Sequence, residues 1–105
     1  MTKVEVSPGN CGMTAVVTAE SDDGQTVRIA VESACPHVCA AAEEVAEVDG
    51  IVEATRPPGE SEVYQALARR CTHSACPVPA AILKAVEVEA GMALPQDVTI
   101  RMTKE

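Results

Sequence analysis

The chain has 105 residues, enough for one domain with a modest core, and its apolar fraction of 47% includes no Phe or Trp and a single Tyr. The core is therefore expected to be aliphatic, which excludes an aromatic platform for stacking bases or sugars. The formal net charge of −8 opposes binding to nucleic acids and to anionic membrane surfaces, because both carry negative phosphate groups.

No targeting or membrane segment is predicted. No apolar run approaches the roughly 20 residues that span a bilayer, and residues 1–10 lack the apolar stretch of a signal peptide. The sequence thus predicts a single domain over residues 1–105, located in the cytoplasm. In that reducing compartment, five cysteines are expected to act as metal ligands, reactive thiols or buried apolar residues rather than as disulfides.

Three β-strands are predicted in the first third of the chain. Residues 3–6 alternate between apolar and polar, as in a half-buried strand. Further strands are predicted over residues 13–20 and 26–33. The Asp23-Gly24 pair between them favours a hairpin turn.

The spacing of apolar residues then changes to that of a helix. From Val38 to Val48 these residues recur on one helical face, and the helix is expected to stop near Asp49-Gly50. Residues 51–54 are predicted to form a short strand or an irregular connection.

Two more helices are predicted in the second half of the chain. Ser61 can cap a helix over residues 62–70, because its hydroxyl can accept a hydrogen bond from a free N–H of the first turn. A third helix is predicted over residues 77–90, with Gly91 as its C-terminal stop.

A closing strand is predicted over residues 97–102, where Val98, Ile100 and Met102 alternate with polar residues. The order is then β-β-β-α-(β)-α-α-β. Such a set of amphipathic elements indicates an α+β fold, a two-layer sandwich in which a mostly antiparallel four-stranded sheet carries three helices on one face.

Four of the five cysteines fall at boundaries between these elements. Cys11 lies in the loop between the first two strands, and Cys35 directly precedes the first helix. Cys71 and Cys76 lie between the second and third helices. Cys39 lies within the first helix, where a packing role is expected because free cysteines are among the most buried residues.

Cys35 and Cys76 each precede a proline at the start of a predicted helix. A helix N-terminus has free N–H groups and a positive dipole end, which favour the thiolate form that binds metals. If both helix starts share one end of the sheet with Cys11, the three sulfurs are expected to lie within about 8 Å of one another. His37 and His73, which follow or precede these cysteines closely, are candidate supporting ligands.

The motifs NCGM (10–13), ACPHV (34–38) and ACPVPAAILKAVEVEAGMALPQDVTI (75–100) resemble those of a family of small uncharacterised proteins from anaerobic bacteria and archaea. The resemblance extends over essentially the whole chain, but it implies no particular function. An anaerobic setting would suit an oxygen-sensitive cluster. The positions that match the pattern of the family are Cys11, Cys35, His37 and Cys76.

The leading hypothesis is a non-catalytic metal-site protein in which Cys11, Cys35 and Cys76 bind an iron–sulfur cluster or a zinc ion. The cluster is favoured over zinc because the cysteine spacings do not form a zinc knuckle. A fourth ligand could come from Cys71, from one of the two histidines, or from an external thiol or partner chain. Beyond these possibilities, the roles of Cys39 and Cys71 stay open.

Two alternatives belong to other classes of protein. The first is a thiol or persulfide carrier, or a redox protein, that uses Cys76 without metal and His73 as its base. The second is a non-catalytic interaction domain whose cysteines only pack. A protein partner or a homodimer is compatible with each hypothesis.

Overall fold

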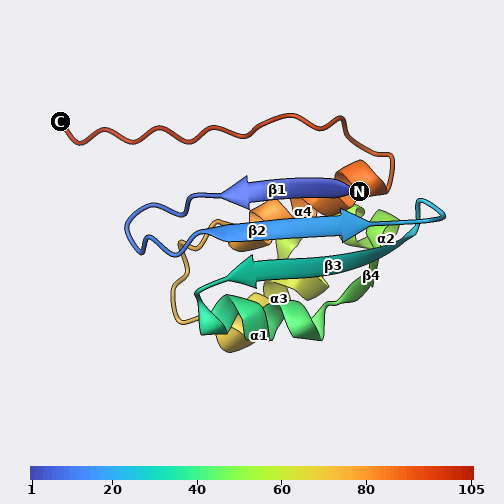
Figure 1. Ribbon diagram of the computed structural model, residues 1–105, viewed down its shortest axis with the longest axis horizontal. Coiled ribbons are helices and arrows are strands. Elements are labelled where there is room, and N and C mark those ends of the chain that lie inside the picture. Colours follow the sequence, from blue (N-terminus) through green and yellow to red (C-terminus); the bar gives the residue numbers. More distant parts are fainter.

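The structure is a computed structural model that describes residues 1–105. It confirms the α+β class, with a four-stranded antiparallel sheet that carries its helices on one face (Figure 1). The strands lie side by side in chain order, and they are β1 (Thr2–Val6), β2 (Ala15–Glu20), β3 (Thr26–Ser33) and β4 (Glu47–Asp49). No helix of the structure is long and apolar enough to cross a bilayer.

The turn between β2 and β3 forms where the sequence predicts it. One carboxylate oxygen of Asp23 accepts hydrogen bonds from the backbone N–H groups of Gln25 and Thr26, each at 2.9 Å. These bonds hold the pKa of the Asp23 carboxyl below its usual value. Gly24 has a φ of 74°, a left-handed conformation that glycine adopts without strain.

The fourth strand is not where the sequence predicts it. Residues 97–102 form no strand, and β4 takes the place that the helical pattern assigned to the end of the first helix. That helix, α1 (Pro36–Glu44), ends sooner. Val48 is buried as predicted, but it belongs to a strand and pairs with Val27 of β3. Burial of residue 48 is compatible with a helix and with a strand, and the pairing with β3 selects the strand.

Residues predicted as a short strand or a connection form a helix instead, α2 (Gly50–Thr55). A carboxylate oxygen of Asp49 caps it by accepting a hydrogen bond from the N–H of Val52 at 3.0 Å. A Cβ atom at Gly50 would lie only 2.7 Å from Val27, so the close approach of α2 to the sheet depends on glycine. Polar capping outweighs the β-propensity of Ile51 and Val52 here.

The other two predicted helices are confirmed. Helix α3 (Glu62–Arg70) follows a single 3₁₀ turn, η1 (Pro58–Glu60), and the hydroxyl of Ser61 accepts a hydrogen bond from the N–H of Tyr64 at 3.2 Å. Helix α4 (Val78–Glu89) ends before Gly91, which has a φ of 74°. The helices therefore number four, one more than predicted, because α2 is added to them.

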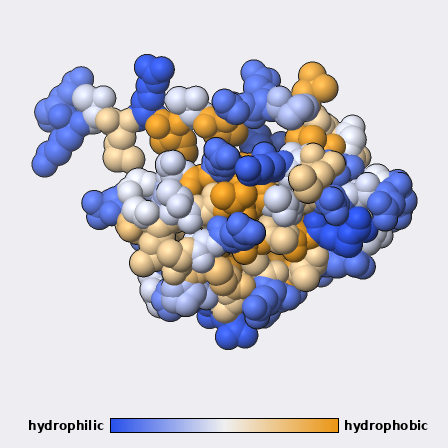
Figure 2. Space-filling view, viewed as in Figure 1, coloured by the Kyte–Doolittle hydropathy of each residue, from blue (hydrophilic) through white to orange (hydrophobic).

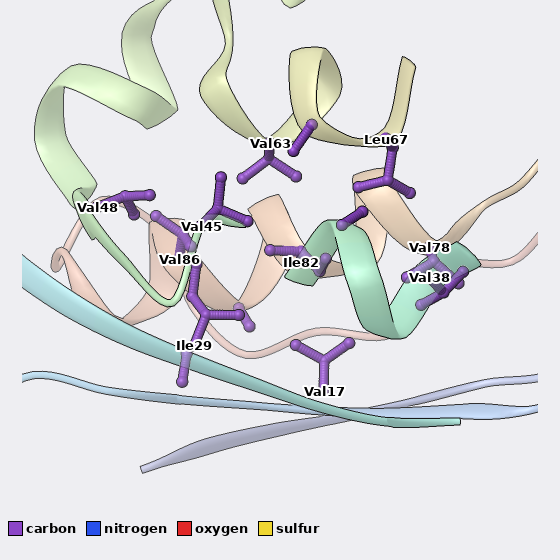
Figure 3. Packing of buried hydrophobic residues seen from close by; sticks show 14 of the residues in the cluster. Val17, Ile29, Val38, Val45, Val48, Val63, Leu67, Val78, Ile82 and Val86 are labelled. Atoms are coloured by element: carbon purple, nitrogen blue, oxygen red, sulfur yellow. The ribbon is translucent and has the colours of Figure 1, made fainter. Parts of the chain in front are cut away.

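The core lies between the sheet and the helices and is aliphatic, as the composition predicts (Figure 3). Val17 and Ile29 point from the sheet towards Val86 and Ile82 of α4. Helix α1 packs on β3 beside α4, and α3 packs against α1 and α4. Its largest fully buried apolar side chains are those of Val17, Val27, Val63, Val78, Ile82 and Val86.

Two carboxylates tie elements together at the surface. Glu89, at the end of α4, accepts hydrogen bonds from the hydroxyl of Thr2 and from the N–H of Ser21. Glu44, at the end of α1, accepts hydrogen bonds from Arg70 at 2.7 Å and from Arg69 at 3.1 Å. Arg70 and then Arg69 keep the pKa of Glu44 below its usual value. The hydrogen bonds of Glu44 with the two arginines hold α3 against α1.

Candidate functional site

A pocket of about 370 Å³ lies at the end of the sheet where β1 and β3 finish and β2 begins. Three separate segments line it: the β1–β2 loop, the start of α1, and the connection between α3 and α4. Its volume is in the lower part of the range for small-ligand sites. Val38, Val78 and Met13 supply apolar walls. The thiol and imidazole side chains in its lining are those of Cys11, Cys35, His37, Cys71, His73 and Cys76.

Cys35 enters the pocket from the N-cap position of α1. Pro36 fixes the first turn of this helix, where its missing N–H has no partner to lose. The N–H of Cys35 donates to the hydroxyl of Ser33 at 3.1 Å, and its carbonyl accepts from the N–H of Cys39 at 3.2 Å. The thiol of Cys35 makes no capping hydrogen bond, so it is available to a ligand.

Cys71 and Cys76 mark the two ends of the connection between α3 and α4. The N–H of Cys71 closes α3 by donating to the carbonyl of Leu67 at 2.7 Å. The N–H of Cys76 donates to the carbonyl of His73 at 3.4 Å, which folds the connection into a turn just before Pro77, the N-cap of α4. This turn brings both thiols and the imidazole into the pocket lining.

Burial raises the pKa of the Cys71 thiol above its ordinary value, and the neighbouring Cys76 and Cys35 raise it further. Cys35 and Cys76 line the same pocket as Cys71. All three residues are also half-buried and pack against the core. The folded protein therefore favours the neutral thiol at Cys71, whereas Cys11 is exposed at the outer side of the pocket.

No three His, Cys, Asp or Glu side chains are already arranged around one point as ligands of a single metal ion. In a tetrahedral zinc site the thiolate sulfurs lie about 3.7–4 Å apart, so the side chains would have to move to form one. An iron–sulfur cubane accepts ligand sulfurs spaced more widely, at roughly 6–7 Å. The donor set of the pocket, thiols with imidazoles, is of the kind that soft metals prefer.

All five residues singled out in the sequence line this pocket, although they come from three segments: Cys11, Cys35, His37, His73 and Cys76. Cys39 lies outside the lining, as predicted, and its thiol donates to the carbonyl of Ser33 at 3.3 Å. It is half-buried rather than fully buried.

The sequence offers Cys71 only as one of several possible fourth ligands, and the structure places it in the same lining. One signal was present, because Cys71 and Cys76 are separated by four residues, the upper limit of the usual spacing of paired ligands. Whether the end of α3 faces the start of α1 is decided by tertiary packing, and this arrangement brings Cys71 to Cys35.

Fold and pocket together define a small α+β sandwich with a pocket of thiol and imidazole groups at one end of its sheet. The chain belongs to a family of unknown function (DUF6951), whose model matches residues 2–102. This confirms the expected membership of an uncharacterised family, and the match includes every residue of the pocket. No curated protein and no solved structure matches the chain.

The raised pKa of Cys71 predicts an order of reactivity among the pocket thiols. In metal-free protein, iodoacetamide should modify exposed Cys11 first and Cys71 last, because the thiolate is the reactive form. The alkylation rate of Cys71 should rise only at a pH above the ordinary range of thiols. Between the ordinary thiol pKa of the unfolded chain and the raised pKa of Cys71 in the folded chain, the unfolded chain binds fewer protons. The free energy of unfolding should therefore fall as the pH rises through this range.

Peptide mass spectrometry of samples quenched at intervals from pH 7 to 10 gives the alkylation rates of Cys11 and Cys71. If the alkylation rate of Cys71 rises at the pH of an ordinary thiol, this account of the pocket is contradicted. Modification of Cys71 before Cys11 would contradict it as well.

Proposed function

We propose that the pocket holds a thiolate-bound metal centre, an iron–sulfur cluster in preference to a zinc ion. The observation that carries the proposal is that four of the five cysteines and both histidines line one pocket, although they lie far apart in sequence. Cys35, Cys71 and Cys76 would be ligands on the inner side, and Cys11 would close the site from the loop. His37 and His73 would serve as further ligands or as hydrogen-bond donors to sulfur.

The electrostatics of Cys71 favour a ligand over a nucleophile. A thiol whose pKa is raised by burial is a poor nucleophile at neutral pH, because little of it is thiolate. A bound cation reverses this, since a thiol that coordinates a metal loses its proton outright. Three neighbouring thiolates would also repel one another unless a metal centre neutralised their charge.

The number of donors in the lining favours a cluster over a single ion. The pocket gathers more donors than one tetrahedral ion uses, but it does not bring three of them around one point. A cluster would fill a larger volume and accept more widely separated sulfurs. The anaerobic setting implied by the sequence resemblance would protect such a cluster from oxygen.

Anaerobic purification followed by assays of iron, acid-labile sulfide and zinc tests this proposal, with visible absorption as an independent readout. The wild-type chain should carry iron and sulfide in similar amounts, directly or after reconstitution. Single Cys35→Ser, Cys71→Ser and Cys76→Ser variants should each lose most of the bound iron. Cys39→Ser is the matched control, because this cysteine lies outside the pocket, and it should keep wild-type loading.

A wild-type protein that binds neither iron nor zinc after reconstitution would overturn the proposal. Equal loss of iron in the Cys39→Ser and Cys76→Ser variants would also count against it. A metal-free protein whose Cys76 alone acquires a labile sulfur adduct would favour the thiol-carrier alternative. If replacing Cys11, Cys35 and Cys76 together by serine leaves the fold and the partners of the protein unchanged, and the wild type binds no metal, the interaction domain is favoured.

A further inference from the structure

Residues 92–105 form an extended tail that leaves the body of the protein after α4 (Figure 1). From residue 94 to the end, every side chain of the tail is exposed. Apolar and polar groups follow one another along it, at the top of the view in Figure 2. Its most exposed large apolar side chains are Leu94 at 84%, Val98 at 62%, Ile100 at 77% and Met102 at 91%.

The tail has the sequence of a strand without the pairing of one. Val98, Ile100 and Met102 alternate with polar residues, a pattern typical of a strand with one buried face. Isolated apolar side chains are common on protein surfaces, but a row of them on one face of an extended segment indicates a partner. The exposed backbone of this segment also has unused N–H and C=O groups.

The sheet offers a matching edge at β1. This strand pairs only with β2, so its outer edge has free backbone donors and acceptors. Val4 and Val6 face the core but are only partly buried, because nothing covers them from the open side. Lys3 and Glu5 point to the opposite face and are exposed.

We propose that the tail of one copy adds as a fifth strand to the β1 edge of a second copy, and that the exchange is reciprocal, which gives a symmetric dimer. The tail starts beside its own β1, since Glu89 binds Thr2, yet it continues past that strand without joining the sheet (Figure 1). A second copy presents the same edge, and two such contacts bury both tails at once.

The charges of the two segments fit this pairing. If Ile100 and Met102 are aligned with Val4 and Val6, Arg101 comes beside Glu5, whether the strands run parallel or antiparallel. Opposite charges side by side on neighbouring strands are favourable. The segment 97–105 has two basic and two acidic residues, so it can approach a protein of net charge −8 without adding to the repulsion.

Sedimentation velocity of the full chain over a range of concentrations tests the proposal. Wild-type protein should be a dimer at micromolar concentration, whereas Ile100→Lys should be a monomer, because a charge would enter the apolar layer. Thr99→Gln is the control on the other face of the tail and should stay dimeric. Circular dichroism should show the same fold for all three proteins, since the tail is exposed in the single chain.

A charge exchange tests the register. Arg101→Glu should weaken the dimer by about tenfold or more, and the double variant Glu5→Arg with Arg101→Glu should restore it. A wild-type protein that is monomeric at every concentration would overturn the proposal. A monomer whose tail amides are protected from hydrogen exchange would also overturn it, because the tail would then pair with its own β1. A dimer that survives Ile100→Lys would likewise reject it.

Discussion

Replacing Glu53 by alanine is expected to lower the free energy of unfolding by about 3 kcal/mol. Glu53 lies in α2 and is only 3% exposed. One of its carboxylate oxygens accepts hydrogen bonds from the hydroxyl of Ser61 and from the N–H of Val63, the latter at 3.0 Å. Its other oxygen lies 3.7 Å from Arg56. Alanine would leave the buried donors at the start of α3 without an acceptor and would disconnect α2 from α3.

Urea denaturation followed by circular dichroism measures this loss. Glu53→Gln keeps a carbonyl acceptor for the two donors and should cost less, about 1–2 kcal/mol, because mainly the charge is lost. Glu60→Ala, at an exposed position of the neighbouring turn, should change the stability by less than about 0.5 kcal/mol. If Glu53→Ala is as stable as Glu60→Ala, the buried carboxylate does not organise this junction.

Replacing Ile82 by alanine should cost a similar amount, about 3 kcal/mol within a range of 2–5. Ile82 is completely buried on α4 and faces the sheet at the middle of the core (Figure 3). The core has no aromatic side chain that could move into the space, and the surrounding valines are branched and stiff. The deleted methyl groups should therefore leave a cavity rather than a collapsed site.

Thermal unfolding provides the readout, with an expected decrease of roughly 12–24 °C in the melting temperature of a domain this size. Ile82→Val should lose about 1 kcal/mol, since one methylene is removed. Ile51→Ala, at a position 45% exposed on α2, is the control and should have a small effect. Equal losses at Ile82 and Ile51 would mean that α4 does not anchor the core.

Local chemistry explains which parts of the fold the sequence predicts. Ser61 and Gly91 delimit their helices by their own capping and conformational preferences, and Asp23 and Gly24 form their turn without distant help. These elements are confirmed because the deciding interactions lie within a few residues. Val48 is different, since burial of this residue suits a helix or a strand and only the distant strand β3 selects the second.

The same distinction applies to residues 97–102 and to the pocket. The alternation around Ile100 is a real strand pattern, but a strand also needs an edge to pair with, and that edge is not encoded locally. Cys35 and Cys76 were recognisable from their positions at helix starts. Their meeting with Cys71 depends on how α3 lies against α1, which no spacing in the sequence reveals.

The order of the strands across the sheet has a consequence for folding. Each strand of β1–β4 pairs with its neighbour in the chain, and β1, β2 and β3 are joined by short loops, so this part of the sheet has a low contact order and can form early. Helix α4, which comes last, covers β1 and β2, and Glu89 ties it to Thr2 and Ser21 at the open end of their hairpin. During synthesis, the valine-rich face of these strands therefore stays uncovered until α4 has left the ribosome, after most of the chain. In that interval the nascent sheet is exposed to aggregation, and docking of α4 ends the exposure.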